Sequence, residues 1–134
     1  MSSPRHGWIL ATAVAVALIG PAAALAQGPW VAPAAEKGKK NPVAAGAKAV
    51  ADGKKSAQVN CVACHGTDGT GKGPAAQALN PKPADWTSAR VQSMSDGELF
   101  WKISNGRGPM PPWKHLAEGE RWALIHYIRS LAKK

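Results

Sequence analysis

Apolar residues recur at helical spacing in three stretches of the chain, and strand signals are absent. The first stretch predicts a helix over residues 42–59. Pro42 suits a first helical position, and one face of this stretch carries Val43, Ala47 and Val50. We therefore expect an all-α fold.

Two further helices are predicted toward the C-terminus. One covers residues 95–104 and begins at Ser95, which forms a capping box with Glu98. The other covers residues 118–132, where one stripe is apolar: Leu124, Tyr127, Ile128 and Leu131. These boundaries predict three main helices joined by long connections.

The long connections and the composition indicate that the chain alone has too few large apolar side chains for a well-packed core. Gly and Pro concentrate in residues 66–90 and 106–116, which are predicted to be loops. The chain has 134 residues, enough for one compact domain, and its 6 Trp contrast with 1 Phe and 1 Tyr. A loop-rich chain this short and this poor in large aliphatic side chains buries little by itself. We therefore expect a bound apolar cofactor to complete the core.

The N-terminal part is predicted to lie outside the folded domain. Residues 1–26 have the charged start, apolar run and small-residue end of a Sec-type signal that is cleaved after Ala26, which predicts export to the periplasm. An uncleaved membrane anchor is the alternative. Residues 27–41 hold too few apolar side chains to pack and are predicted to be a flexible leader without structure. The folded domain is expected to cover residues 42–134.

The charge of the chain predicts an acidic partner. Lys and Arg number 17 against 8 Asp and Glu, a formal net charge of +9, and these charges are spread along the sequence. Removal of residues 1–26 would take away only Arg5, so the mature chain stays basic. No nucleic-acid recognition motif or basic helix face is present, and export also argues against a nucleic-acid partner.

The most informative residues are Cys61-Val62-Ala63-Cys64-His65, a C-x-x-C-H sequence that attaches c-type haem. Two thiols on one helical turn can form thioethers with the two vinyl groups of a haem, and the adjacent imidazole can coordinate iron through Nε2. A thiol–disulfide redox pair would be expected in a βαβ context, which is missing. A zinc site would need two more ligands at matching spacing, and these are missing too.

The second axial ligand is predicted to be Met110, which lies in a loop held by three prolines. Met94 is better explained as the partner of Leu99 in a hydrophobic staple around the helix start. Lys114 or His115 is the alternative ligand. A neutral thioether with an imidazole favours ferrous iron and raises the reduction potential.

These motifs resemble those of the monohaem class I cytochromes c, in particular the bacterial branch similar to the cytochrome c domains of haem-copper oxidase third subunits. The resemblance covers about residues 42–131, through the haem motif, Asn105-Gly106 and Met110-Pro111. It implies a small class I cytochrome c fold, with about three main helices and loops wrapped around one covalent haem c.

The resemblance also implies a role for each residue of the site. Cys61 and Cys64 would carry the haem, with His65 as its proximal ligand and Met110 as its distal ligand. The carbonyl of Pro74 would accept the Nδ1 proton of His65 and so fix the imidazole ring.

A helix crossing is implied as well. The family packs its first helix across its last through a Gly and an aromatic residue, and Gly53 matches the first of these positions. Ala57 departs from the second, so we expect Leu124, Tyr127 or a tryptophan to fill the gap. The same alignment places His126 on the outer face of the last helix, away from any ligand role.

The predicted function is that of a periplasmic one-electron carrier, monomeric when free, with no open iron site and hence no enzymatic activity. Membrane contact would be indirect, through a partner complex. Several basic residues are expected around the haem edge, where they would steer an acidic partner: Lys54, Lys55, Lys72, Lys82, Lys102, Arg107 and Lys114. The alternatives are an electron-entry subunit of a larger dehydrogenase or oxidase, and a small peroxidase or ligand sensor in which Met110 leaves the iron.

Overall fold

The structure is a computed structural model that describes residues 28–133. The predicted signal, residues 1–26, lies outside this part of the chain. Within it the fold is all-α, as predicted, and the two residues Arg107 and Met110 form an isolated β-bridge but no strand. The α-helices and one short 3-10 helix follow in the order α1 Ala34–Lys37, α2 Ala47–Asn60, α3 Val62–His65, η1 Ala76–Ala78, α4 Ala89–Gln92, α5 Asp96–Asn105 and α6 Glu118–Ser130.

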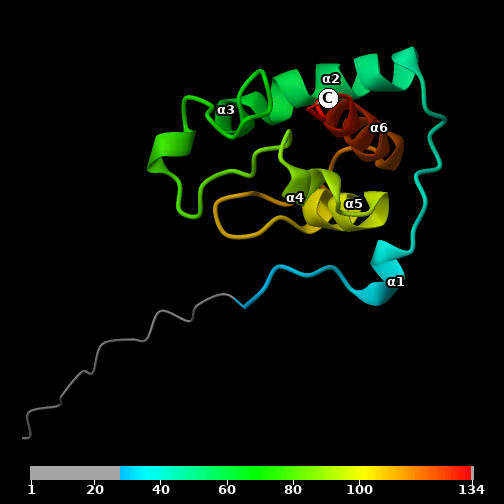
Figure 1. Ribbon diagram of the computed structural model, residues 1–134, viewed down its shortest axis with the longest axis horizontal. Helices are drawn as coiled ribbons and strands as arrows, with labels where there is room; N and C mark the ends of the chain where they lie inside the picture. Colours follow the sequence, from blue (N-terminus) through cyan, green and yellow to red (C-terminus); the bar gives the residue numbers. More distant parts are fainter. Residues whose placement is uncertain (1–27, 134) are drawn as a thin grey trace, which may run out of the picture.

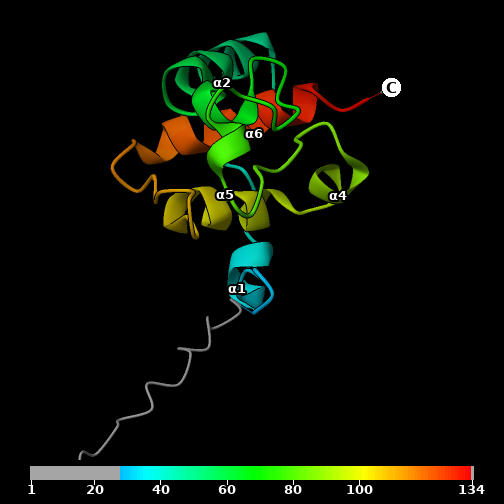
Figure 2. The same ribbon diagram turned by 90° about the vertical axis from the view of Figure 1, so that its left-hand side faces the viewer.

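The helices stack in the order α2, α6, α5 and α1, as two perpendicular views show (Figures 1 and 2). The closest approach is between α2 and α6. A Cβ atom added to Gly53 would lie 2.1 Å from the carbonyl oxygen of Ala123, so only glycine allows this crossing. Ala57 is fully buried, and it shares a core cluster with Leu124, Tyr127 and two tryptophans, the residues expected to compensate for the missing aromatic residue. The predicted crossing is therefore present.

The predicted start of the first helix is wrong, because α2 begins at Ala47 and Pro42 lies outside it. The segment before α2 is used for contacts with α6. The side chain of Asn41 donates from Nδ2 to the carbonyl of Trp122 over 3.0 Å and accepts from the amide of Val43. His126 donates from Nε2 to the carbonyl of Val43 over 2.7 Å. His126 is thus half-buried beneath this segment, and it does not line the cavity described below.

The other two predicted helices begin where the sequence places them. Ser95 caps α5, accepting from the amide of Glu98 over 3.1 Å. The Glu98 carboxylate pairs with Lys102 over 2.8 Å, so this half of the capping box is replaced by an ion pair along the helix. The last helix, α6, begins at Glu118 and ends at Ser130. None of the helices in residues 28–133 is long and apolar enough to cross a membrane.

Residues 28–41 differ from the flexible leader that their composition predicts. They contain α1 and lie beside α5 (Figure 1). The contacts that hold them are mostly made by backbone atoms, together with the side chains of Trp30, Ala32 and Asn41, and α1 itself has no buried residue. A composition poor in apolar residues gives no signal for this kind of packing.

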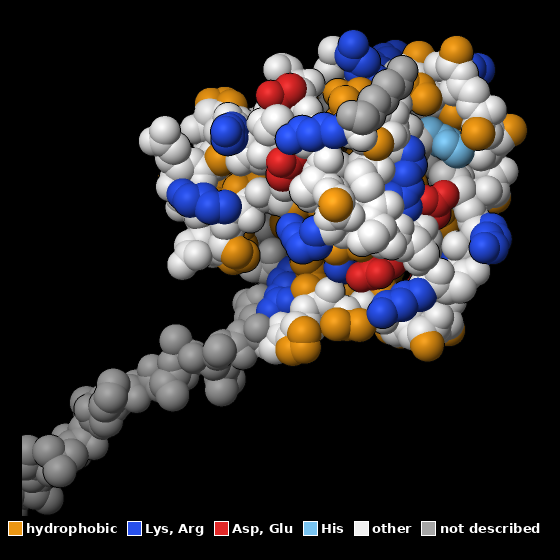
Figure 3. Space-filling model, viewed as in Figure 1, with side chains coloured by type: hydrophobic (Ala, Val, Ile, Leu, Met, Phe, Trp, Pro, Cys, Tyr) orange, Lys and Arg blue, Asp and Glu red, His pale blue; other side chains and the backbone are white. Residues whose placement is uncertain are grey.

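On the face seen in Figure 3, basic side chains are dispersed among fewer acidic ones. Lys102 is an exception, because its side chain is only 11% exposed and its ammonium group pairs with Glu98. The expectation that Lys102 contributes to a docking surface is therefore wrong.

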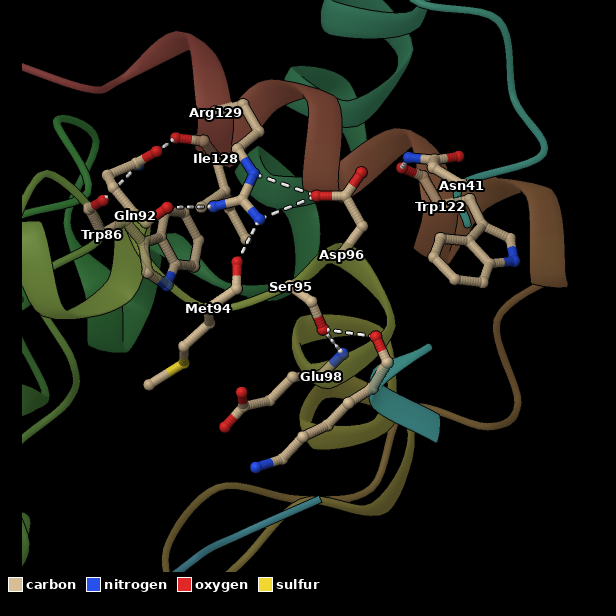
Figure 4. A network of polar contacts seen from close by, with 11 residues as sticks. Asn41, Trp86, Gln92, Met94, Ser95, Asp96, Glu98, Trp122, Ile128 and Arg129 are labelled. Atoms are coloured by element: carbon tan, nitrogen blue, oxygen red, sulfur yellow. Dashed lines mark hydrogen bonds and ion pairs between the residues drawn. The ribbon is translucent and has the colours of Figure 1, made fainter. Parts of the chain in front are cut away.

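One polar network joins α4, α5 and α6 (Figure 4). The guanidinium of Arg129 in α6 donates to the carboxylate of Asp96 over 2.7 and 3.0 Å. It also donates to the carbonyls of Gln92 and Met94. The side chain of Gln92 in turn donates to the carbonyl of Ile128 over 2.8 Å. This network fixes the end of α6 against the connection between α4 and α5.

Candidate functional site: a haem cavity

A cavity of about 720 Å³ brings the predicted site residues together. Cys61, Cys64, His65 and Met110 all line it. Its remaining walls come from residues 79–86, the end of α5 with residues 107–113, and α6. The volume falls within the range of roughly 300–1,000 Å³ that is usual for cofactor sites. The cavity therefore has the size and the lining that a bound organic cofactor requires.

The haem motif is folded into one tight turn. The amides of Cys64 and His65 both donate to the carbonyl of Cys61, over 3.1 and 2.9 Å. The next segment folds back on this turn, because the amide of Gly73 donates to the carbonyl of Cys64. A Cβ on Gly73 would lie 2.5 Å from the carbonyl oxygens of the motif, so glycine is required at this close approach. Both thiols and the imidazole thus reach one cavity from consecutive positions.

The ring of His65 is oriented by a backbone carbonyl other than the one that the resemblance implies. Its Nδ1 lies 3.0 Å from the carbonyl oxygen of Ala84, and because a carbonyl can only accept, Nδ1 carries the proton. Pro74 is exposed and does not line the cavity, so its proposed role is wrong. The segment around Pro74 is turned toward the backbone of the motif, whereas residues 83–86 return over the imidazole. Trp86 stacks on the ring with centroids 4.4 Å apart.

The protonation of the cavity side chains suits an apolar metal cofactor. Burial lowers the pKa of His65, and the hydrogen bond to Ala84 opposes this only in part. A neutral imidazole with its proton on Nδ1 leaves the Nε2 lone pair free for a metal. Burial, with the neighbouring Cys64 and Glu120, raises the pKa of Cys61 to about 12. A neutral sulfur is thus favoured here, and a thioether satisfies that without burying a charge.

Met110 reaches the cavity because its loop doubles back. Gly106 has a φ of 60° and begins the turn. The amides of Arg107 and Met110 then donate to each other's carbonyls, over 2.8 and 3.0 Å, and the amide of Trp113 returns to the carbonyl of Ile103 in α5. The alternative ligands Lys114 and His115 are exposed and do not line the cavity.

Met94 lies away from the cavity. It is partly buried against the core, and its sulfur accepts from the ammonium of Lys102 over 3.4 Å. Of the two methionines weighed as ligands, only Met110 lines the cavity.

Three of the described tryptophans line the cavity: Trp30, Trp86 and Trp113. Trp122 instead stacks on Phe100, with centroids 3.9 Å apart. The place of Trp30 in the cavity was not predicted from the sequence. Its signal was a single large aromatic residue within a stretch otherwise composed of small, proline and charged residues.

Residues 48–128 match the family model described as Cytochrome C oxidase, cbb3-type, subunit III. The chain belongs to this family. It is therefore a monohaem class I cytochrome c domain, and the predicted family and fold are confirmed. Membership implies a c-type haem with iron, to which the two cysteines of the motif are suited. No curated protein matches the cytochrome.

One solved structure resembles the cytochrome over most of its length. It is a chain of the Kuenenia stuttgartiensis reducing HAO-like protein complex Kustc0457/Kustc0458, with a TM-score of 0.62 and 31% sequence identity. The alignment covers 69% of this cytochrome and 47% of that chain. The cytochrome thus spans about half the length of this neighbour, which belongs to a complex of two proteins.

Proposed function

We propose that the protein is a periplasmic one-electron carrier that holds one covalent haem c between His65 and Met110 and has no enzymatic activity of its own. The observation that supports this most is the single cavity lined by both cysteines of the motif, its histidine and Met110. A cytochrome c domain serves electron transfer, and the bound haem supplies the one-electron ferric/ferrous couple.

Each residue of the cavity has a defined task in this proposal. Cys61 and Cys64 fix the cofactor covalently. The Nδ1–H group of His65 donates a hydrogen bond to the carbonyl of Ala84, which leaves Nε2 to bind the metal in the loaded protein. Met110 provides a neutral sulfur from a loop whose turn is held by backbone hydrogen bonds. If His65 and Met110 both bind the iron, no open position would remain for a substrate.

The partner in this proposal presents an acidic surface, and the carrier is monomeric when free. Two cations line the cavity, Lys82 and Arg107, and further exposed lysines lie elsewhere: Lys54, Lys55, Lys72 and Lys114. Electrostatic steering predicts that the rate of electron exchange falls as ionic strength rises. A rate that does not depend on salt would contradict the acidic partner.

A second candidate is an electron-entry subunit of a larger oxidoreductase, favoured by the solved neighbour that is part of a complex. Size-exclusion chromatography of a native periplasmic extract separates the two. A free carrier elutes alone, whereas a subunit elutes with its complex.

Met110 offers a sharp test because Met94 provides a matched control outside the cavity. The intact mass and a pyridine haemochrome spectrum of the exported protein should first show one covalent haem. Met110→Ala should then abolish the weak red-edge methionine–iron charge-transfer band of the oxidised protein and lower its reduction potential, whereas Met94→Ala should retain the band. A mass without haem would refute the whole proposal, and a band that survives Met110→Ala would refute this ligand.

A further inference from the structure

We propose that residues 28–38, here called the N-terminal strap, form a wall of the haem cavity, and that Trp30 shields the Met110 side of the haem from water and thereby raises its reduction potential. This inference rests on the proposed function. The strap lies before residues 48–128, which match the family model, so the match does not cover it.

The strap is docked onto the beginning of α5 through backbone contacts. The hydroxyl of Ser95 donates to the carbonyl of Lys37 over 2.8 Å. A Cβ atom added to Gly97 would lie 2.0 Å from the carbonyl oxygen of Glu36, so the strap passes directly against the helix. Ala32 is only 2% exposed. These contacts hold the strap without a hydrophobic helix face.

The other end of the strap is held at the end of α5, beside the Met110 loop. The guanidinium of Arg107 donates to the carbonyl of Gly28. The ammonium group of Lys102 lies 5.3 Å from the ring centroid of Trp30, within the range of a cation–π interaction. Lys102 is itself fixed by its ion pair with Glu98. The indole therefore lies against a cation of α5 whose position does not depend on the strap, and the backbone of the strap is held next to it by Arg107.

From its position, Trp30 should affect the reduction potential of the iron more than the stability of the fold. It lines the cavity together with Ile103, Arg107 and Met110, yet it is not a member of the buried core cluster. Ferric haem carries one more positive charge than ferrous haem, so a drier and more apolar surrounding favours the ferrous state. Removal of the indole would admit water on the Met110 side and stabilise the ferric state.

Trp30→Ala is the direct test, and Val31→Ala is its control because Val31 is 53% exposed and does not line the cavity. We expect Trp30→Ala to lower the reduction potential in a redox titration, Trp30→Phe to restore part of the loss, and Val31→Ala to leave it unchanged. Circular dichroism should show the same helix content in all variants. Equal potentials for Trp30→Ala and Val31→Ala would overturn the proposal.

Gly97→Ala tests the strap from its other end, at a residue that does not itself line the cavity. The added methyl group would displace the strap at Glu36, so we expect a lower potential and faster proteolytic cleavage within residues 28–40. An unchanged potential despite faster cleavage would overturn the role of the strap. Covalent haem and the charge-transfer band are measured in the parent protein, so a failure of the proposed ligation is recognised separately.

Discussion

The crossing of α2 and α6 predicts a large effect for the smallest possible substitution, Gly53→Ala. The added Cβ would lie 2.1 Å from the carbonyl oxygen of Ala123, 2.6 Å from its carbonyl carbon and 3.0 Å from the amide nitrogen of Leu124. Ordinary van der Waals contact begins at 3.4 Å, so the nearest atom is about 1.3 Å too close. All three neighbours are backbone atoms of a helix and cannot rotate away. The two helices would have to separate.

Two opposing effects set the change in the free energy of unfolding caused by Gly53→Ala. Replacement of a glycine within a helix by alanine favours the helix by about 1 kcal/mol. Overpacking of a core costs about 1–3 kcal/mol, and a clash with rigid backbone lies at or beyond the upper end of that range. We therefore expect Gly53→Ala to lower the free energy of unfolding by about 2 kcal/mol.

Guanidinium unfolding followed by circular dichroism measures this loss, and Gly119→Ala is the matched control. Gly119 lies in α6, and a Cβ there would meet nothing within 4 Å. The control should therefore be neutral or stabilising, by at most about 1 kcal/mol. If Gly53→Ala were as stable as Gly119→Ala, the steric argument for the crossing would be refuted.

Three further predictions concern polar contacts, each measured by the same unfolding assay. Arg129→Ala should cost about 2 kcal/mol, because it removes the ion pair with Asp96 and leaves two carbonyls without their donor; a loss as small as that of an exposed alanine substitution would contradict the network. Ser95→Ala should cost about 1 kcal/mol through the lost helix cap, and a neutral result would show that the cap is replaceable. Hydrogen bonds from the hydroxyl and amide of Thr87 hold the pKa of Asp85 below its usual 3.8. The stability from this carboxylate is thus present above about pH 4 and is lost as pH falls through the lowered pKa. Asp85→Asn should therefore destabilise the protein at pH 7 and progressively less as the pH falls below about 4, and an effect that does not change with pH would contradict this.

The sequence predicts α5 and α6 well because their signals are local. Ser95 caps its own helix, and the stripe that contains Leu124 and Ile128 belongs to a single helix. The prediction of where α2 starts is wrong because the start is set by a tertiary contact and not by the local sequence. Pro42 and Val43 could continue a helix, but the carbonyl of Val43 is used by His126, which is distant in sequence.

The candidate site divides in the same way. Cys61, Cys64 and His65 are adjacent in sequence, so the motif predicts their chemistry directly. Met110 follows from a proline-rich loop and the family pattern, and it lines the same cavity. The carbonyl that orients His65 belongs to Ala84, a residue without any side-chain signal, and only the path of the chain selects it. Backbone acceptors of this kind are not visible in a sequence.

The cavity and the core are physically continuous, so a bound cofactor would extend the core. Leu124 and Ile128 belong to the buried core cluster and also line the cavity. An apolar haem placed there would remove these surfaces from water on their second side and add packing that the chain lacks. Anything that binds the native state but not the unfolded state stabilises the native state. A cofactor in the cavity would therefore pack directly against residues of α6 that also form the core. Helix α6 in turn contacts α2 at Gly53, and α2 leads directly into the haem motif.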